Sequence, residues 1–281
     1  MSILRVLLWP FRKRESARHT PAPQSPPASL TLDQYEQIVP LSFLEEGGKQ
    51  VIYHTPNRFA EWRVKTLFSK EPDTIAWIAS FGADDILLDI GANVGMYTIW
   101  AAATRGVRVY AFEPESQNFA LLNRNIFTNK LRDRVTAYCV ALSDTAGFST
   151  LFLPGFTAGG SGHSFAEDVD HHLKPRKAIH QQGCYAAPLD ELIEKGVMPV
   201  PTHIKIDVDG FEHRVIAGAR NTLKNPALKS ILVEINSLLP EHRAIVDELQ
   251  ALGFSYSDEQ VKAARRTEGS SAGVGNYVFR R

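Results

Sequence analysis

Residues 204–213 read IKIDVDGFEH, an apolar run that leads into Asp207, Asp209 and Glu212 around Gly210. Carboxylates can accept a proton from a substrate, offset a positive charge on a ligand or bind a hard cation such as Mg²⁺. Alternation along a strand would put Asp207 and Asp209 on one face, at the carboxyl end where parallel sheets bind ligands. Glu212 would lie in the first turn of the next helix, where a carboxylate could instead act only as a cap.

A second cluster of chemically useful residues is LLDIGANVG, residues 87–95, where an apolar run gives way to a helical pattern. Gly91 and Gly95 allow the backbone to approach a ligand and to present helix N-terminal N–H groups. The glycines alone leave a ligand-free turn open as an alternative. Asp89 precedes the turn, and Glu113 closes the next strand, where an acid can accept both ribose hydroxyls. We therefore expect a bound nucleoside.

The turn lacks the glycine spacing of a dinucleotide site, which limits the kind of nucleoside that it could bind. A dinucleotide site needs the spacing G-x-G-x-x-G, but position 93 is Asn. Asp89 would repel a pyrophosphate, whereas it would attract a cationic ligand. The sulfonium and amino groups of S-adenosylmethionine fit this charge, so that molecule is the expected cofactor.

Strand and helix patterns alternate along most of the chain, which predicts an α/β fold with a mostly parallel sheet and helices on both faces. A stretch without clear pattern, 154–187, interrupts this alternation. The expected strands are 85–90, 107–112, 134–142, 148–154, 203–208, 230–236, 254–257 and 276–281. The expected helices are 63–81, 96–104, 116–129, 188–196, 211–223 and 240–253.

The two ends of the chain differ in composition, and we expect three parts. Residues 1–29 carry a short apolar and basic run and a Pro-rich linker, too short in apolar length to span a membrane. A disordered tail is the expected form, with weak contact of residues 1–14 to a membrane surface as the alternative. Residues 30–80 are expected to form a helical extension, and residues 81–281 the main domain.

Overall charge and cysteine content set limits on partners and location. The chain has 31 basic and 31 acidic residues, so no overall basic field attracts nucleic acid. Its 2 cysteines are too few for a disulfide framework or a zinc site. We expect a cytoplasmic protein, peripheral at the inner membrane face if the tail binds lipid.

The ordered motifs DIGANVGMYT, AFEPESQNFALLNRNI, VALSD, PLDEL, IKIDVDGFEHRVIAGA and ILVEIN resemble the FkbM family of S-adenosylmethionine-dependent methyltransferases. The resemblance covers residues 70–258. It implies a class I methyltransferase fold, Rossmann-like, with seven strands, the last antiparallel and inserted beside the fifth. Residues 276–281 (NYVFRR), which follow an expected linker at 259–275, fit that strand. It also implies O-methylation of a small hydroxylated acceptor, such as a sugar or a natural product.

The resemblance further implies roles for individual residues. Glu113 would hold the ribose, and Asn118 would support it unless it is a structural amide on an exposed face. Asp144, beside Ser143, would accept the adenine amino group unless it only caps a turn. Asp207 would line the cofactor pocket. The residues that would wrap the methionine portion are Asp89, Gly91, Ala92, Asn93 and Gly95.

A hydroxyl that attacks a methyl group must lose its proton, so the site requires a base. The candidates are Asp209, Glu212 and His163, together with His213. His163 lies in the glycine-rich stretch GGSGHS, which could form a lid over the site. An ordinary surface histidine is the alternative. The acids could bind Mg²⁺, but metal-free chemistry is favoured because the resemblance carries no metal.

Two other classes of function remain as alternatives. A nucleic-acid methyltransferase would need a basic groove or stacking aromatic side chains, and no N-P-P-Y type motif occurs. A nucleotide-binding module without catalysis would have no need of the acids after residues 203–206. The acceptor cannot be named, because residues 30–70 and 154–187 are expected to build its pocket.

Overall fold

The computed structural model describes residues 30–269 and 271–281. The predicted tail, its membrane contact and its linker lie outside the described residues. Helix α1 (Leu32–Glu36) belongs to a small unit that ends at Val39, and it begins with a capping box between Thr31 and Gln34. The sheets and all the other helices lie in the second unit, Pro40–Arg281. Within the described residues, no helix is long and apolar enough to cross a membrane.

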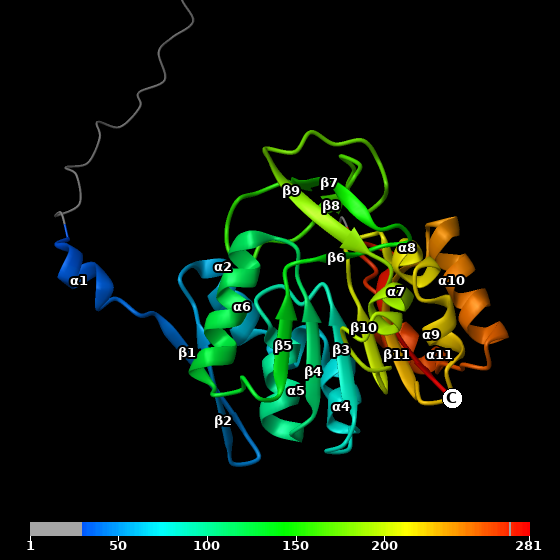
Figure 1. Ribbon diagram of the computed structural model, residues 1–281, viewed down its shortest axis with the longest axis horizontal. Coiled ribbons are helices and arrows are strands. Elements are labelled where there is room, and N and C mark those ends of the chain that lie inside the picture. Colours follow the sequence, from blue (N-terminus) through cyan, green and yellow to red (C-terminus); the bar gives the residue numbers. More distant parts are fainter. Residues whose placement is uncertain (1–29, 270) are drawn as a thin grey trace, which may run out of the picture. The chain divides into compact units, whose positions relative to one another are not determined.

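The main sheet has six strands in the order β12-β11-β10-β3-β4-β5 (Figure 1). All neighbours are parallel except β12, which is antiparallel to β11. The predicted mixed sheet with an antiparallel last strand is therefore confirmed. The strands are β3 (Ile86–Ile90), β4 (Arg108–Phe112), β5 (Val135–Tyr138), β10 (His203–Ile206), β11 (Ser230–Asn236) and β12 (Val274–Arg280).

The predicted seventh strand, residues 254–257, is the main error in this sheet. Only one bridge forms there, between Ser255 and Arg280 at the outer edge of β12. The segment is too short to pair further, because Phe254 is buried in the core and Ser257 already caps helix α11 (Asp258–Ala264). Helix α11 itself falls in a stretch expected to be a linker.

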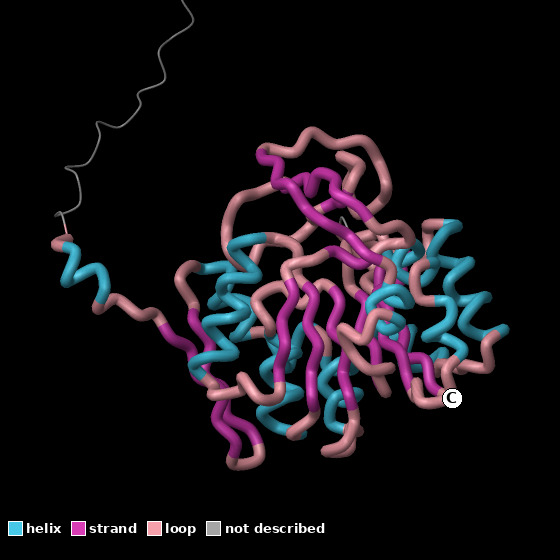
Figure 2. The backbone as a smooth tube through the Cα atoms, in the orientation of Figure 1, coloured by secondary structure: helices cyan, strands magenta, loops and turns pink. Residues whose placement is uncertain are grey.

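Helices cover both faces of the sheet, and each face has its own apolar core (Figure 2). Leu87 packs into one core and Leu88, the next residue, into the other. Strands buried on both faces read as continuous apolar runs, which is why the sequence identified them. One face carries α4 (Pro72–Ala79), α5 (Met96–Arg105) and α6 (Ser116–Thr128). The other carries α7 (Leu189–Glu194), α8 (Glu212–Ala217), α9 (Arg220–Lys224) and α10 (Pro240–Ala251).

Two predicted helices are divided in the structure. The helix expected at 211–223 is broken between α8 and α9 at Gly218, where a Cβ atom would lie 2.1 Å from the carbonyl oxygen of Ser143. The helical region expected at 63–81 is divided into α2 (Arg58–Lys65), α3 (Leu67–Lys70) and α4. The start of α4 has a local cause, because its first residue is Pro72 and a proline cannot continue a preceding helix.

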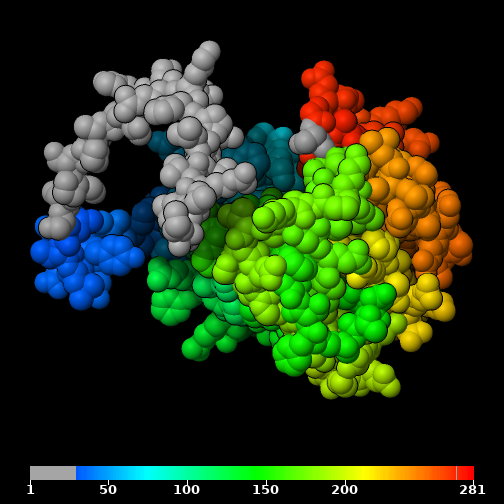
Figure 3. All heavy atoms as spheres, turned by 90° about the horizontal axis from the view of Figure 1, so that it is seen from above, coloured from blue at the N-terminus to red at the C-terminus, as the bar shows by residue number. Residues whose placement is uncertain are grey.

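A smaller sheet lies beyond the carboxyl ends of the main strands, in the order β6-β9-β7-β8 (Figure 1). Seen from above, the residues of this part of the chain, in shades of green, cover much of the face (Figure 3). The strand expected at 134–142 is divided, because its last residues leave β5 and pair with β9 instead. Strand β9 falls in the stretch expected to be a loop, where glutamines and a glycine hide the alternation. The strands are β6 (Ala141–Leu142), β7 (Gly147–Leu153), β8 (Ser164–Phe165) and β9 (His180–Ala187).

The segment 30–80 is not wholly helical, as it was expected to be. It contains a hairpin of β1 (Leu41–Glu46) and β2 (Lys49–His54), joined at Gly47 and Gly48. The hydroxyl of Tyr53, which is fully buried, donates a 2.9 Å hydrogen bond to the carbonyl oxygen of Met96. The hairpin therefore packs against the start of α5, and the helix that follows it, α2, reaches the functional site.

Candidate active site

The turn after β3 lies directly against the turn after β10. Gly91 has φ +78°, and a Cβ atom there would lie 1.9 Å from the carbonyl oxygen of Asp207. Only glycine fits this contact. Gly91 was expected because a ligand approaches the backbone there, and the contact with Asp207 is a second, structural reason for glycine at this position. Asn93 also has a positive φ, +52°, and its side-chain amide donates to the carbonyl oxygen of Gly160 at 2.6 Å.

Glu113 follows β4 and faces the same turn. Its Oε2 accepts from the N–H of Asn93 at 2.7 Å, and its Oε1 accepts from the N–H of Glu115 at 2.9 Å. Burial raises the pKa of Glu113 to about 7, although these backbone hydrogen bonds oppose the rise. Each oxygen keeps a lone pair, so the carboxylate could still accept hydroxyl groups from a ligand.

Asp207 and Asp89 differ sharply in their surroundings. Burial opposes the ionisation of Asp207, but the charges of Lys205 and Lys70 lower its pKa to about 2. The Lys205 ammonium is 2.9 Å from Oδ2 of Asp207. The side chain of Asp89 is buried. Its Oδ2 accepts a hydrogen bond from the hydroxyl of Thr98, and its Oδ1 has no hydrogen-bond partner among the described residues. Burial raises the pKa of Asp89.

Asp209 occupies a strained position in the turn after β10. Its φ is +55°, which is unusual for a residue other than glycine and costs about 1–3 kcal/mol. Oδ2 accepts from the N–H of Gly162 at 2.7 Å. Burial, and then the nearby charge of Asp207, raises the pKa of Asp209.

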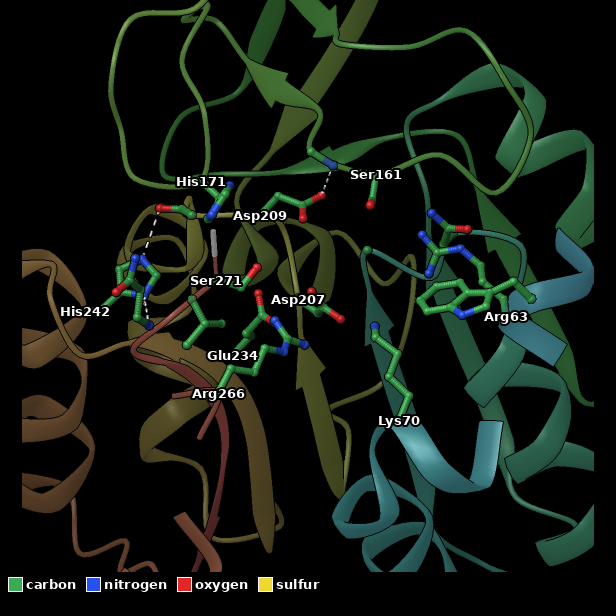
Figure 4. A pocket seen from close by; sticks show the side chains of 17 residues that line it. Arg63, Lys70, Ser161, His171, Asp207, Asp209, Glu234, His242, Arg266 and Ser271 are labelled. Atoms are coloured by element: carbon green, nitrogen blue, oxygen red, sulfur yellow. Dashed lines mark hydrogen bonds and ion pairs between the residues drawn. The ribbon is translucent and has the colours of Figure 1, made fainter. Parts of the chain in front are cut away.

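Three cavities meet at Gly91, Asn93 and Asp207, which line all of them. The apolar cavity, of about 80 Å³, also includes Phe112, Glu113, Pro114, Val140, Ala141, Leu142, His163, Val208 and Phe211. The polar cavity, of about 450 Å³, also includes Trp62, Arg63, Lys70, Ser161, His171, Asp209, Glu234, Asn236, His242 and Arg266 (Figure 4). The side cavity, of about 40 Å³, also includes Arg63, Thr66, Lys70, Glu71, Ala92, Tyr97 and Lys205.

The glycine-rich loop 157–163 closes over this junction and is held from several elements. Asn118 on α6 is fully buried, accepts from the N–H of Gly159 at 2.7 Å and donates to the carbonyl oxygen of Gly160 at 3.2 Å. Arg63 on α2 donates to the carbonyl oxygen of Gly159 at 2.6 Å. The loop therefore joins the N-terminal segment to the turns after β3 and β10.

Several predicted cofactor residues do not line a cavity. Gly95 serves the packing of α5 on α6, since a Cβ there would lie 2.4 Å from Leu122. Ser143 is buried and donates to Asp144, whose exposed carboxylate also accepts from Thr145. They directly follow Val140, Ala141 and Leu142, which line the apolar cavity, but they line no described cavity themselves, so their predicted contact with an adenine stays a prediction. Asp144 fits the alternative of a turn residue.

Asn118 supports the glycine-rich loop, and its side chain also reaches Glu113, where its hydrogen bond opposes the rise in the pKa of that carboxyl. Its predicted support of the ribose site stays a prediction, whereas the alternative of an exposed structural amide is wrong because the side chain is fully buried. Asp89 and Asn118 thus lie behind the site, whereas Gly91, Ala92, Asn93, Glu113 and Asp207 line its cavities.

The predicted bases are separated in space. Glu212 is fully buried, accepts from the N–H groups of Val208 and Gly210, and lies 3.2 Å from His242. It lines none of the described cavities, so a role in direct proton transfer is not supported. His163 is half-buried in the apolar cavity, where burial lowers its pKa to about 4. His213 lines no described cavity, so Asp209 and His163 are the predicted bases that line one, and Asp209 alone of them lines the polar cavity.

Sequence patterns missed the charged residues on two sides of the polar cavity. Arg63 and Lys70 enter from one side, and Glu234, Arg266 and His242 from the other, with Asp207 and Asp209 between them (Figure 4). Glu234 could have been predicted from the sequence, because the strand ILVEIN ends at the same edge of the sheet as the strands that carry the other acids. The predicted contribution of 30–70 and 154–187 to this pocket is matched by Arg63, Lys70, Ser161 and His171.

Within the described residues, no group of three or more His, Cys, Asp and Glu side chains is arranged to hold a metal ion. Oδ2 of Asp207, the most acidic carboxylate at the junction, is instead paired with Lys205.

The sheet order, with its antiparallel last strand and a ligand site across the turns after β3, β4 and β10, is that of a class I methyltransferase. The model of the FkbM methyltransferase domain matches residues 89–256. This chain belongs to the FkbM family of S-adenosylmethionine-dependent methyltransferases.

Two characterised relatives and one solved structure are similar to it. The 31-O-demethyl-FK506 methyltransferase of Streptomyces tacrolimicus is 30% identical over 66% of this chain and 82% of that protein. The hexuronic acid methyltransferase of Haloferax volcanii is 26% identical over 63% and 66%. The crystal structure of an FkbM methyltransferase from Methylobacillus flagellatus KT has 14% identity and a TM-score of 0.46, over 72% of this chain and 44% of that one.

Proposed function

We propose that this protein methylates a hydroxyl group of a small molecule, with S-adenosylmethionine as the methyl donor. The observation that carries the proposal is the meeting of an apolar cavity and a larger polar cavity at Gly91, Asn93 and Asp207. The apolar cavity ends at Glu113 and suits a nucleoside. The polar cavity suits a hydroxylated acceptor. The relatives that methylate an FK506 precursor and a hexuronic acid support this choice of acceptor class.

The residues at the junction fit the cofactor. Glu113 would accept the ribose hydroxyls, and Phe112, Val140 and Leu142 would contact the adenine. The ionised carboxylate of Asp207 would offset positive charge at the donor. When bound, S-adenosylmethionine supplies an electrophilic methyl group on a sulfonium. Water is kept from this point by the glycine-rich loop, which Asn93 and Asp209 hold in place.

Asp209 is the proposed proton acceptor. It lines both the polar and the apolar cavity, so it lies at the boundary where the acceptor hydroxyl would approach. One of its oxygens is fixed by the N–H of Gly162, which orients the carboxylate. Its raised pKa makes it a stronger base than an exposed aspartate, provided that it is ionised.

An acceptor screen tests the proposal. Purified protein and S-adenosylmethionine are incubated with monosaccharides, uronic acids and hydroxylated macrolides, and S-adenosylhomocysteine is measured. Acceptor-dependent product with a new O-methyl group would support it. Binding of the cofactor without transfer to any hydroxylated compound would favour a nucleotide-binding module instead.

A further inference from the structure

Arg63 is a charged residue of the site that the family match does not include, because α2 precedes residues 89–256. Its side chain lines both the polar cavity and the side cavity. Nε donates to the carbonyl oxygen of Gly159 at 2.6 Å, which fixes the plane of the guanidinium. Within the described residues, its two terminal nitrogens make no hydrogen bond or ion pair. They are available for a ligand.

The other cations around these cavities are already paired. Lys70 lies 2.9 Å from Glu71, Lys205 lies 2.9 Å from Asp207, and Arg266 lies 3.2 Å from Glu234. Arg63 is thus the one arginine or lysine of the two cavities that forms no ion pair among the described residues, although its charge helps to lower the pKa of Asp207. Half-buried N–H groups of a guanidinium that have no hydrogen-bond partner are costly, and their fork matches a carboxylate in two parallel hydrogen bonds.

The position of Arg63 selects which carboxylate it meets. The side cavity is small, opens at Gly91 and Asn93, and places Arg63 across from Asp207 (Figure 4). An amino acid bound there would meet a cation on one side and an anion on the other. The methionine portion of the cofactor carries both complementary groups, an α-carboxylate and an ammonium.

We propose that Arg63 binds the α-carboxylate of S-adenosylmethionine through its terminal nitrogens, while Asp207 binds the ammonium group. The inference rests on the proposed function, since it assumes this cofactor. It gives the N-terminal segment a direct part in cofactor binding. It also ties that binding to the glycine-rich loop, because the same guanidinium holds Gly159.

The test compares two ligands that differ by one carboxylate, S-adenosylmethionine and its decarboxylated form. Their affinities are measured by calorimetry for the wild type, Arg63→Ala and Arg58→Ala. Arg58 is an exposed arginine on the same helix and lines none of the described cavities, so it is the matched control. The wild type and Arg58→Ala should bind S-adenosylmethionine more tightly than the decarboxylated form, on the order of 10- to 100-fold. Arg63→Ala should bind both ligands about equally.

The ratio of the two affinities decides the outcome. If Arg63→Ala keeps the wild-type ratio, the inference is wrong, even if both affinities fall, because a uniform loss would mean that Arg63 acts only through the loop. Should Arg63→Ala not fold, Arg63→Gln keeps the stem and an amide donor for Gly159, and the same loss of the ratio is expected. A folded wild type that binds neither ligand would contradict the proposed function itself, and the inference with it.

Discussion

The backbone N–H of Asn93 donates a 2.7 Å hydrogen bond to Oε2 of Glu113, which joins the turn after β3 to the end of β4. This hydrogen bond holds together the two parts of the predicted nucleoside site. Pre-organisation of this kind reduces the cost of binding, because the groups need no further ordering.

Glu113→Ala should weaken cofactor binding by about 1.5–3 kcal/mol, the usual range for hydrogen bonds to a charged group. Calorimetry with S-adenosylhomocysteine measures the effect. Glu194→Ala is the control, since Glu194 is exposed at the end of α7 and lines none of the three cavities. Equal affinity in Glu113→Ala and the wild type would remove Glu113 from the site.

The affinity for the cofactor should fall as the pH drops below 7. Burial raises the pKa of Glu113 to about 7, and hydroxyl donors favour its ionised form, so binding below pH 7 must release a proton. The stability of the unbound protein should depend on pH in the opposite sense to its affinity for the cofactor. A raised pKa in the folded state means that Glu113 contributes stability below pH 4.5, which is lost as the pH rises through 7.

Calorimetry in buffers with different ionisation enthalpies measures this proton release directly. The wild type should release a fraction of one proton at pH 6 that vanishes by pH 9, and Glu113→Gln should release none of it. The same proton release in Glu113→Gln would assign the titration to another group.

Gly91→Ala should both unfold more easily and lose the cofactor. An alanine at positive φ costs about 1–2 kcal/mol by itself. At Gly91 the added Cβ must also displace the backbone of Asp207, from which it would lie only 1.9 Å away. Gly253→Ala isolates the first effect, because its φ is +86° and no atom lies within 4 Å. Equal melting temperatures for the two variants would show that the contact with Asp207 is easily relaxed.

Asp207→Asn and Asp209→Asn should separate binding from turnover. Asp207→Asn leaves the buried ammonium of Lys205 without its partner, which should cost roughly 3 kcal/mol of stability and also weaken cofactor binding. Asp209→Asn should spare affinity and reduce kcat by about 10²- to 10⁴-fold. EDTA should leave the wild type active. Chelator sensitivity that Mg²⁺ reverses would replace this scheme with a metal site.

Asn118→Ala should loosen the glycine-rich loop. It removes the acceptor of the Gly159 N–H and one donor to Gly160, so the amide hydrogen of Gly159 should exchange about tenfold faster or more. Asn123→Ala on the exposed face of the same helix is the control. Unchanged exchange at Gly159 would mean that Arg63 and Asn93 suffice to hold the loop.

The sequence was informative where burial is two-sided. Strands β3, β4, β10 and β11 are apolar along their length, so the residues that follow them could be placed at one edge of the sheet. Gly91, Glu113, Asp207 and Asp209 were found in this way. The chain then switches from β5 to the smaller sheet within one apolar run, and no local pattern marks that change. Ser143 and Asp144 come directly after this switch, so their predicted contact with the cofactor stays a prediction.

Other parts of the site depend on contacts between distant segments. Arg63 meets Gly159, which lies 96 residues away in sequence. It is one of three basic residues on the short helix α2, so the sequence alone did not indicate which of them would face the site. Arg266 reaches Glu234 from a stretch that read as a linker. Such residues become visible only when the fold brings their elements together.

The central claim is that this protein transfers a methyl group to a hydroxyl in the polar cavity, with Asp209 as the proton acceptor. The most direct measurement is product formation with the best compound from the acceptor screen, with the site of methylation determined by NMR. The wild type should give an O-methyl product, and Asp209→Asn should have a kcat at least about 10²-fold lower with unchanged cofactor affinity. Methylation at nitrogen or carbon, or full turnover by Asp209→Asn, would contradict it.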